Sequence, residues 1–182
     1  MEKKFIVSKI VSGGQTGADC GGLDAAIEIG IPHGGWCPKG RKAEDGVIPE
    51  KYHLQEMTSA DYLKRTEQNV IESDATVIFT YGKPTGGSKR TVDFCKKHSK
   101  LYLCLDLSIM LDTRAAAKLL AFLENQHGGM LLMPVERMPK VPGNPVLNIA
   151  GSRESKAPGI QLRVKNILVL TLSGKVYPMG SE

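Results

Sequence analysis

Apolar, β-branched runs alternate along this chain with segments whose apolar residues recur at helical spacing. The runs lie at Phe5–Val11, Ala75–Tyr81, Leu101–Leu107 and Val146–Ala150. Strands separated in this way by helices pair in parallel, because the helix carries the chain back to the starting edge of the sheet. The alternation therefore predicts an α/β fold built on a parallel sheet.

Three segments have the pattern of helices. Residues 112–129 carry an apolar stripe, and Asp112 can cap their start. Residues 59–74 form a second predicted helix with Ser59 as its N-cap, and we expect both helices to serve packing. The C-terminal apolar segment suits a helix or a strand, but Pro158 near its start favours a helix.

Two stretches interrupt the alternation. Residues 31–58 are rich in glycine, proline and charge, and a loop of that length is usually functional. Short strands around Gly35–Cys37 and Tyr52–Glu56 are possible within it. Residues 130–145 contain four prolines, which exclude a long regular element and predict an excursion before the last strand.

Length and composition limit the class of protein. With 182 residues, we expect a single domain over residues 1–182. The net charge of +5 is spread along the chain, and only 5% of residues are aromatic, so we expect no nucleic-acid binding. The N-terminus lacks the uninterrupted apolar stretch of a signal peptide, and no run is long enough to cross a membrane. These features predict a cytoplasmic protein.

The cysteines give no sign of a metal centre. They stand far apart and include no C-x-x-C pair; they are Cys20, Cys37, Cys95 and Cys104. Structural zinc sites use closely spaced pairs of such residues. We therefore expect reduced thiols and no protein metal site.

Three predicted strands are each followed by small residues and then by a helical pattern. These loops are Ser12–Asp19 (SGGQTGAD), Thr85–Arg90 (TGGSKR) and Gly151–Glu154 (GSRE). In an open parallel sheet such loops lie at the carboxyl edge, so we expect all three to face one crevice. Glycines at Gly13, Gly14, Gly17, Gly86 and Gly87 would let the backbone approach a ligand closely.

The remaining residues of these loops suit an anionic ligand. The hydroxyl groups are those of Thr16, Thr85, Ser88 and Ser152, and the cations are Lys89, Arg90 and Arg153. Guanidinium and ammonium groups form charge-assisted hydrogen bonds with phosphate. Asp19 would repel phosphate, so two roles stay open for it: an interaction with the helix dipole, or acceptance of bonds from a ribose hydroxyl or a pterin N–H.

The chain resembles a known family over residues 8 to 170. The strings that carry the resemblance are SGGQTGAD, WCPKGRKAEDG, ADYLKRTEQNVIESDAT, TGGSKRTVDF and VLNIAGSRES. They are similar to the molybdenum cofactor carrier family, which is grouped with the YpsA-like and lonely-guy nucleotide-binding proteins. The resemblance implies a Rossmann-like open sheet, mostly parallel, with helices on both faces in a three-layer α/β/α arrangement.

The resemblance also implies a ligand and a set of contacts. The ligand would be the molybdenum cofactor (molybdopterin), a pterin dithiolene with a terminal phosphate, or a nucleotide. Matching positions in this chain are Gly13, Gly14, Gln15, Thr16, Gly17, Lys39, Arg41, Gly86, Gly87, Ser88 and Arg153. The family further implies a homo-oligomer whose partners are molybdoenzymes or proteins of cofactor biosynthesis.

Two other functions stay open beside the carrier. Relatives that are enzymes cleave nucleoside monophosphates with a P-G-G-x-G-T-x-x-E motif, and TGGSKRTVD keeps two glycines and a final acid, Asp93. Asp19, Glu44, Asp45 and Asp93 are the candidate catalytic acids of such a phosphoribohydrolase. Lys89 and Arg90 replace the Gly-Thr pair, which favours binding over catalysis. A nucleotide-sensing module is the other possibility.

Overall fold

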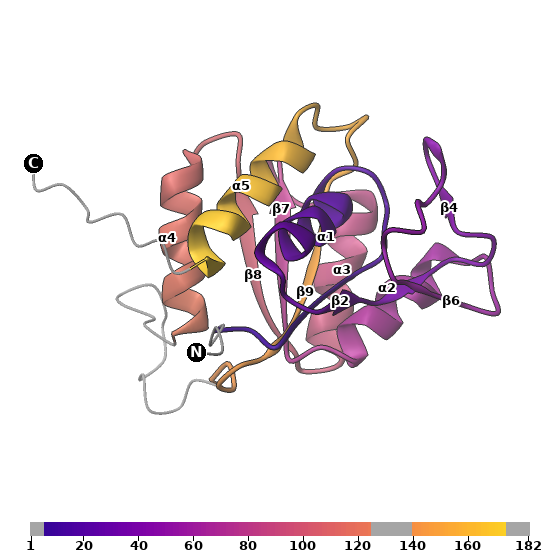
Figure 1. Cartoon of the computed structure of the whole chain (residues 1–182), viewed down its shortest axis with the longest axis horizontal. Helices are drawn as coiled ribbons and strands as arrows, with labels where there is room; N and C mark the ends of the chain where they lie inside the picture. The colour runs from indigo at the N-terminus through magenta and orange to yellow at the C-terminus, as the bar shows by residue number, and fades with distance from the viewer. Residues whose placement is uncertain (1–5, 125–139, 174–182) are drawn as a thin grey trace, which may run out of the picture.

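The computed structural model describes residues 6–124 and 140–173 and contains a five-stranded parallel sheet (Figure 1). In spatial order the strands are β2 (His33–Gly34), β1 (Lys9–Ser12), β9 (Val146–Gly151), β7 (Ala75–Thr80) and β8 (Leu101–Asp106). Every neighbouring pair runs parallel. The predicted α/β class and parallel sheet are therefore confirmed.

Helices cover both faces of this sheet, as the three-layer expectation requires. The helices are α1 (Ala18–Ile29), α2 (Tyr62–Ile71), α3 (Gly86–Lys97), α4 (Asp112–Leu123) and α5 (Ile160–Leu172). Helices α1, α4 and α5 pack together on one face, while α2 and α3 pack together on the other (Figure 1). The C-terminal segment that suited a helix or a strand is thus a helix.

The strand order explains where a ligand can enter. The last strand, β9, lies in the middle of the sheet between β1 and β7. If β9 is counted first, followed by β1, β2, β7 and β8, the spatial order becomes third, second, first, fourth, fifth. That is the order of the Rossmann sheet, whose ligand crevice opens between the first and fourth strands. The corresponding crevice here lies at the carboxyl ends of β9 and β7.

The region 31–58 folds into short strands rather than an irregular loop. Strand β3 (Trp36–Cys37) pairs with β6 (Gln55–Glu56), at the places where short strands were possible. Between them, β4 (Lys42–Ala43) and β5 (Gly46–Val47) form an antiparallel hairpin. A small apolar cluster that includes Ile48 and Tyr52 attaches this region to α1.

Two predicted helix starts were wrong. Asp61, not Ser59, caps α2, because its carboxylate accepts the Leu63 N–H at 2.8 Å. Asp112 is the first residue of α4 rather than its cap, and its carboxylate pairs with Arg163 at 2.7 Å.

Some other predictions have changed or untested limits. The first strand begins at Lys9 and is shorter than the apolar run that starts at Phe5. Phe5, the end of the segment 112–129 and most of the Pro-rich stretch 130–145 lie outside the described residues.

Candidate functional site

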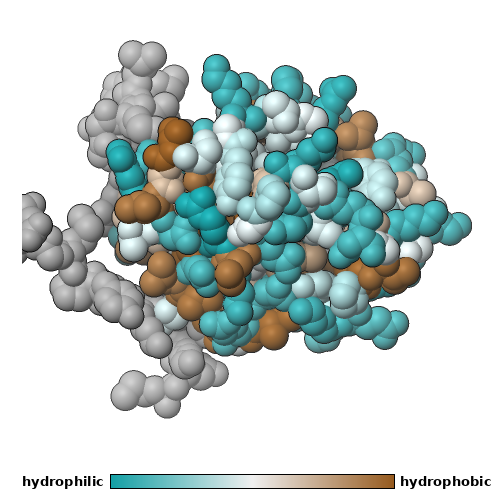
Figure 2. All heavy atoms as spheres, turned by 90° about the horizontal axis from the view of Figure 1, so that it is seen from above, coloured by the Kyte–Doolittle hydropathy of each residue, from teal (hydrophilic) through white to brown (hydrophobic). Residues whose placement is uncertain are grey.

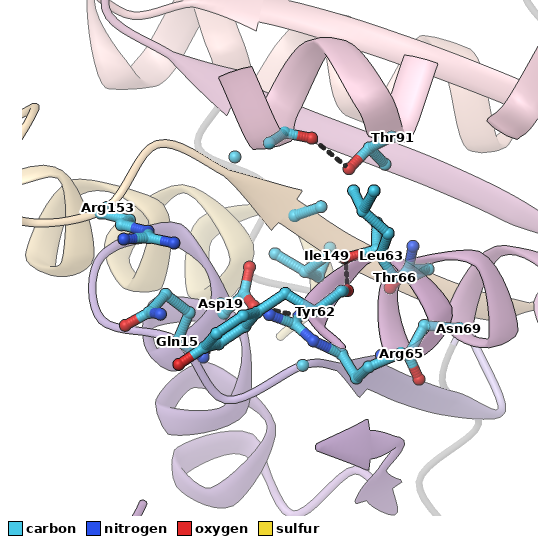
Figure 3. Close-up of a pocket in the computed structure, with 15 residues that line it drawn as sticks. Gln15, Asp19, Tyr62, Leu63, Arg65, Thr66, Asn69, Thr91, Ile149 and Arg153 are labelled. Carbon is cyan, nitrogen blue, oxygen red and sulfur yellow. Dashed lines mark hydrogen bonds and ion pairs between the residues drawn. The ribbon is translucent and has the colours of Figure 1, made fainter. Parts of the chain in front are cut away.

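A pocket lies at the carboxyl edge of the sheet, where the three glycine-rich loops meet (Figure 3). Its lining consists of Gly13, Gln15, Asp19, Tyr62, Leu63, Arg65, Thr66, Asn69, Gly87, Thr91, Asn148, Ile149, Ala150, Gly151 and Arg153. Each of the three loops contributes to that lining. The expectation that the loops face one crevice is therefore confirmed.

The first and third loops are fixed against each other by their backbones. Gly17 has φ of +81°, and a Cβ built on it would lie 2.4 Å from the carbonyl oxygen of Ser152. The Ala18 N–H donates to that same oxygen at 3.0 Å. The Thr16 hydroxyl oxygen accepts the Glu154 N–H at 3.3 Å. Only glycine fits at residue 17, since both the positive φ and the close approach exclude a side chain.

The second loop begins helix α3 and leaves open space beside its first turn. The Thr85 N–H donates to the Ser88 hydroxyl at 3.0 Å, which holds the helix start. A Cβ on Gly86 or Gly87 would meet no heavy atom of residues 6–124 and 140–173 within 4 Å, and Gly87 lines the pocket. The first N–H groups of a helix have no partner within the helix, so they suit an anion.

A buried ion pair forms one wall of the pocket. The Arg65 guanidinium on α2 lies 3.0 Å from the Asp19 carboxylate on α1, and the side chains are only 10% and 8% exposed. The same carboxylate oxygen accepts the Gln15 N–H at 3.2 Å. Gly13 makes room for the pair, because a Cβ there would lie 1.3 Å from Arg65 Nη1.

Burial and pairing act in opposite directions on Asp19. Burial raises the pKa of its carboxyl, while the Arg65 guanidinium and the Gln15 N–H act to lower it. The Nε of Arg65 is buried and has no hydrogen-bond partner among the described residues. Each member of the pair therefore neutralises the buried charge of the other, and together they form a polar wall of the pocket.

Tyr62 and Arg153 border the pocket and come from different parts of the fold (Figure 3). Tyr62 begins α2, Arg153 follows β9, and the guanidinium carbon lies 5.9 Å from the centre of the tyrosine ring. Both residues are exposed at their positions. An aromatic face beside a guanidinium suits a flat heterocycle that carries a phosphate.

Several residues expected at the ligand have other contacts. Arg41 donates to the carbonyl oxygens of Ile48, Leu54, Pro49 and Tyr52, and therefore holds the 48–54 segment. The Glu154 carboxylate accepts the Gly159 and Gln161 N–H groups at the start of α5.

The remaining expected contacts stand outside the lining. Lys89 pairs with Asp93 at 2.9 Å on the outer surface of α3, and the hydrogen bond to Lys89 holds the pKa of Asp93 below its usual range. Neither lines the pocket, and the other predicted contacts outside it are Gly14, Thr16, Gly17, Lys39, Thr85, Gly86, Ser88, Arg90 and Ser152.

The sequence reading missed the contribution of α2. That helix was expected only to pack, yet it supplies Tyr62, Leu63, Arg65, Thr66 and Asn69 to the pocket. Tyr62, Arg65, Thr66 and Asn69 follow one another at intervals that place them on one face of a helix, which is a signal that could have been used.

Two polar residues on the sheet side were missed as well. Asn148 interrupts the apolar strand β9 and is 3% exposed, and its amide donates to Thr76 at 3.2 Å. Thr91 on α3 is also buried and lines the pocket. Because a buried polar group needs a hydrogen-bond partner, a polar residue inside an otherwise apolar strand indicates that polar groups lie next to that strand.

The polar groups of this edge extend over the outer surface. Figure 2 shows the molecule from above Figure 1, toward the ends of the strands, and polar side chains cover most of that face.

In the described part of the chain, no group of three His, Cys, Asp or Glu residues could hold a metal ion. All four cysteines are free thiols. No helix in residues 6–124 and 140–173 is both long and apolar enough to span a bilayer.

Comparisons with known proteins agree with this architecture. The family model described as "Circularly permutated YpsA SLOG family" matches residues 10–172, and a permutation accounts for a last strand in the centre of the sheet. A crystal structure from Syntrophus aciditrophicus SB, described as "Putative molybdenum carrier protein", is 42% identical with a TM-score of 0.79. The similarity covers 94% of this chain and 98% of that one. No curated protein matches.

Proposed function

Because this chain belongs to the circularly permuted YpsA SLOG family, we propose that it binds a phosphorylated pterin of the molybdenum cofactor type, or a nucleotide, and carries it. The observation that supports this proposal is the meeting of three glycine-rich loops at one pocket, with Arg153 on its border. Backbone N–H groups and a guanidinium together are suited to phosphate. The description of the related crystal structure as a molybdenum carrier supports the pterin.

The pocket's residues fit the molybdenum cofactor. Gly87 and Arg153 would hold the phosphate, Tyr62 offers a ring face to the pterin, and Thr91 and Asn148 provide polar atoms. The lining, as far as the described part of the chain forms it, contains no cysteine and no histidine. The cofactor's own dithiolene supplies the sulfur ligands for molybdenum, so the chain has only to hold and shield the pterin and its phosphate.

The positions of the candidate acids favour a carrier over a hydrolase. Glycoside cleavage requires a carboxyl group beside the bond that breaks. Of the four candidate acids only Asp19 lines the pocket, and Arg65 and the Gln15 N–H already bind its carboxylate. Release of ribose 5-phosphate from nucleoside monophosphates, abolished by Asp19→Asn or Asp93→Asn, would instead support the hydrolase.

Native mass spectrometry of protein purified gently without oxygen is the direct test. We expect a bound mass that matches the pterin dithiolene, with or without molybdenum. A nucleotide mass would agree with the phosphate site but identify the ligand as a nucleotide, and it would favour a sensing role. Protein that carries neither mass, and that binds neither compound on addition, would overturn the proposal. A carrier also needs a donor and an acceptor, so we expect contact with molybdoenzymes or cofactor-biosynthesis proteins.

Two variants with matched controls test the position of the ligand. Arg153→Ala should weaken binding of the compound found by mass spectrometry by about 1–3 kcal/mol, as loss of a charge-assisted bond does. Arg114→Ala removes an exposed arginine from α4 and should leave binding unchanged. Gly87→Ala places a methyl group in the open space of the pocket and should weaken binding, whereas Gly143→Ala, also in open space, should not.

A further inference from the structure

The carboxylate of Glu44 lies among hydrogen-bond donors that belong to the first and third glycine-rich loops or follow them directly. The Thr16 hydroxyl and the Ser155 N–H both donate to Glu44 Oε1, the latter at 3.2 Å. The Ser155 hydroxyl donates to Oε2 at 2.6 Å. Two chain segments 139 residues apart in sequence (155 − 16) thus converge on one carboxylate.

Glu44 is the point at which a protruding hairpin attaches to these loops. It lies in the turn of the β4–β5 hairpin, residues 42–47, and its N–H donates to Gln15 Oε1 at 2.9 Å. The same amide oxygen accepts the Thr16 N–H at 3.0 Å. Since Gln15 lines the pocket, the attachment of the hairpin lies directly beside the ligand site.

The hairpin is also held at its base and by one apolar contact, since Ala43 in β4 packs against the cluster that includes Ile48 and Tyr52. Its base is fixed where the Ile48 N–H donates to the Arg41 carbonyl oxygen at 2.7 Å and Arg41 binds the following segment. Beyond the base, its two strands have two residues each, and Val47 is 72% exposed. Release of the Glu44 carboxylate would therefore loosen the tip, while the base of the hairpin, the Glu44 N–H bond to Gln15 and the core stay in place.

The donors around Glu44 favour a negative charge. Hydrogen bonds from Ser155 and Thr16 hold the pKa of Glu44 below its usual range, and the positive charge of Arg153 acts in the same direction. Two hydroxyl groups, one backbone N–H and a nearby guanidinium are equally suited to a phosphate, which has more acceptor oxygens and more charge than a carboxylate.

We propose that Thr16, Ser155 and the Ser155 N–H form a subsite for the phosphate of a phosphate monoester, and that Glu44 fills it until the ligand displaces its carboxylate. The inference rests on the proposed function, since it assumes a phosphorylated ligand in the adjoining pocket. The subsite is an alternative to Gly87 as the position of the ligand's single phosphate, and Arg153 acts on this position as well. It also requires the Glu44 side chain, at the tip of the hairpin, to move when the ligand binds.

Titration calorimetry on the full chain tests the subsite with three probes: guanosine 5′-monophosphate, guanosine and inorganic phosphate. Glu44→Gln keeps the shape of the side chain but exchanges a charged acceptor for a neutral one. We expect it to bind the monophosphate about tenfold more tightly than the unaltered protein, because a weaker internal competitor is displaced. Guanosine, which lacks the phosphate, should bind both proteins alike. Tighter binding of inorganic phosphate alone would assign the subsite to the free ion rather than to a ligand's phosphate, and would overturn the inference.

Asp45→Asn is the matched control. Asp45 is the neighbouring exposed acid and has no hydrogen bond or ion pair to the described residues, so its replacement removes the same charge without freeing a donor. We expect its affinity for the monophosphate to stay within about twofold of the unaltered protein. Hydrogen exchange at the Glu44 position should be faster in the glutamine variant than in the control, since a neutral side chain holds the tip less firmly.

The outcomes separate this inference from the proposed function. If all three proteins bind the monophosphate equally, or the glutamine variant binds more weakly, the subsite is wrong while phosphate binding in the pocket stands. If neither the unaltered protein nor the glutamine variant binds the monophosphate, the inference is overturned. The proposed function is then decided separately by the mass of the molecule that co-purifies.

Discussion

Removal of Arg65 should destabilise this protein far more than removal of any exposed arginine. The guanidinium and the Asp19 carboxylate are about nine-tenths buried and 3.0 Å apart, so loss of Arg65 leaves a buried carboxylate with the Gln15 N–H as its main partner. Breaking a buried pair from one side costs about 3–5 kcal/mol. We choose Arg65→Met because methionine keeps the apolar part of the side chain.

Chemical denaturation in urea gives the free energy of unfolding of each variant. We expect Arg65→Met to lose about 3–5 kcal/mol, and Arg65→Met/Asp19→Asn to lose less than half of that, because asparagine carries no charge that needs a partner. Arg114→Met, on the exposed surface of α4, should lie within about 0.5 kcal/mol of the unaltered protein. A loss below about 1 kcal/mol for Arg65→Met would refute the reasoning, as would a double variant no more stable than the single one.

The same variant should show a characteristic pH dependence. Burial raises the folded-state pKa of Asp19, and without Arg65 a group that lowers this pKa is gone. Between the unfolded-state pKa of about 4 and the raised folded-state pKa, the folded protein binds more protons than the unfolded chain. The unfolding free energy of Arg65→Met should therefore fall as the pH rises through that window and recover below about pH 4. A deficit that does not change with pH would show that packing, not charge, is the cause.

Three further predictions follow from single contacts. Gly13→Ala places a Cβ 1.3 Å from Arg65 Nη1, so it should cost at least about 2 kcal/mol in urea denaturation, while Gly143→Ala should cost nothing measurable. Glu154→Ala removes the acceptor for two N–H groups at the start of α5 and should cost about 1 kcal/mol in the same assay. A thiol reagent should label exposed Cys104 first and leave Cys20 unlabelled until unfolding, because burial raises the pKa of Cys20 to about 12; equal labelling rates would contradict the burial.

Four strands of the sheet could be predicted from the sequence because their evidence is local, whereas β2, with two residues and no apolar run, could not. Each apolar run identifies a strand without reference to any other part of the chain. The position of β9 could not be predicted in that way, since its pairing with β1 and β7 joins residues far apart in sequence. Strand order depends on the packing of whole elements, which a periodic pattern does not encode.

The glycine loops predicted where the pocket lies, but much of its side-chain lining was not predicted. Glycine loops after strands indicated the correct edge of the sheet. Arg65 escaped notice because a polar position on an amphipathic helix normally faces water, and its partner Asp19 lies on a different helix. Arg41 was expected to bind the ligand, but the carbonyl oxygens of its own loop need a donor and its guanidinium satisfies them.

The glycines of the three loops divide into two groups with different physical explanations. Gly17 and Gly151 are required by the protein itself, since Cβ atoms there would lie 2.4 Å from the Ser152 oxygen and 2.0 Å from the Phe79 oxygen. Gly87 has no such requirement: its φ is ordinary, its surroundings are open, and alanine would suit a helix better. Internal packing thus explains the glycines of the first and third loops but does not explain Gly87, for which the proposed approach of a ligand's phosphate would be the reason. For this reason Gly87→Ala separates the binding proposal from the architecture more cleanly than a change at either of the other two.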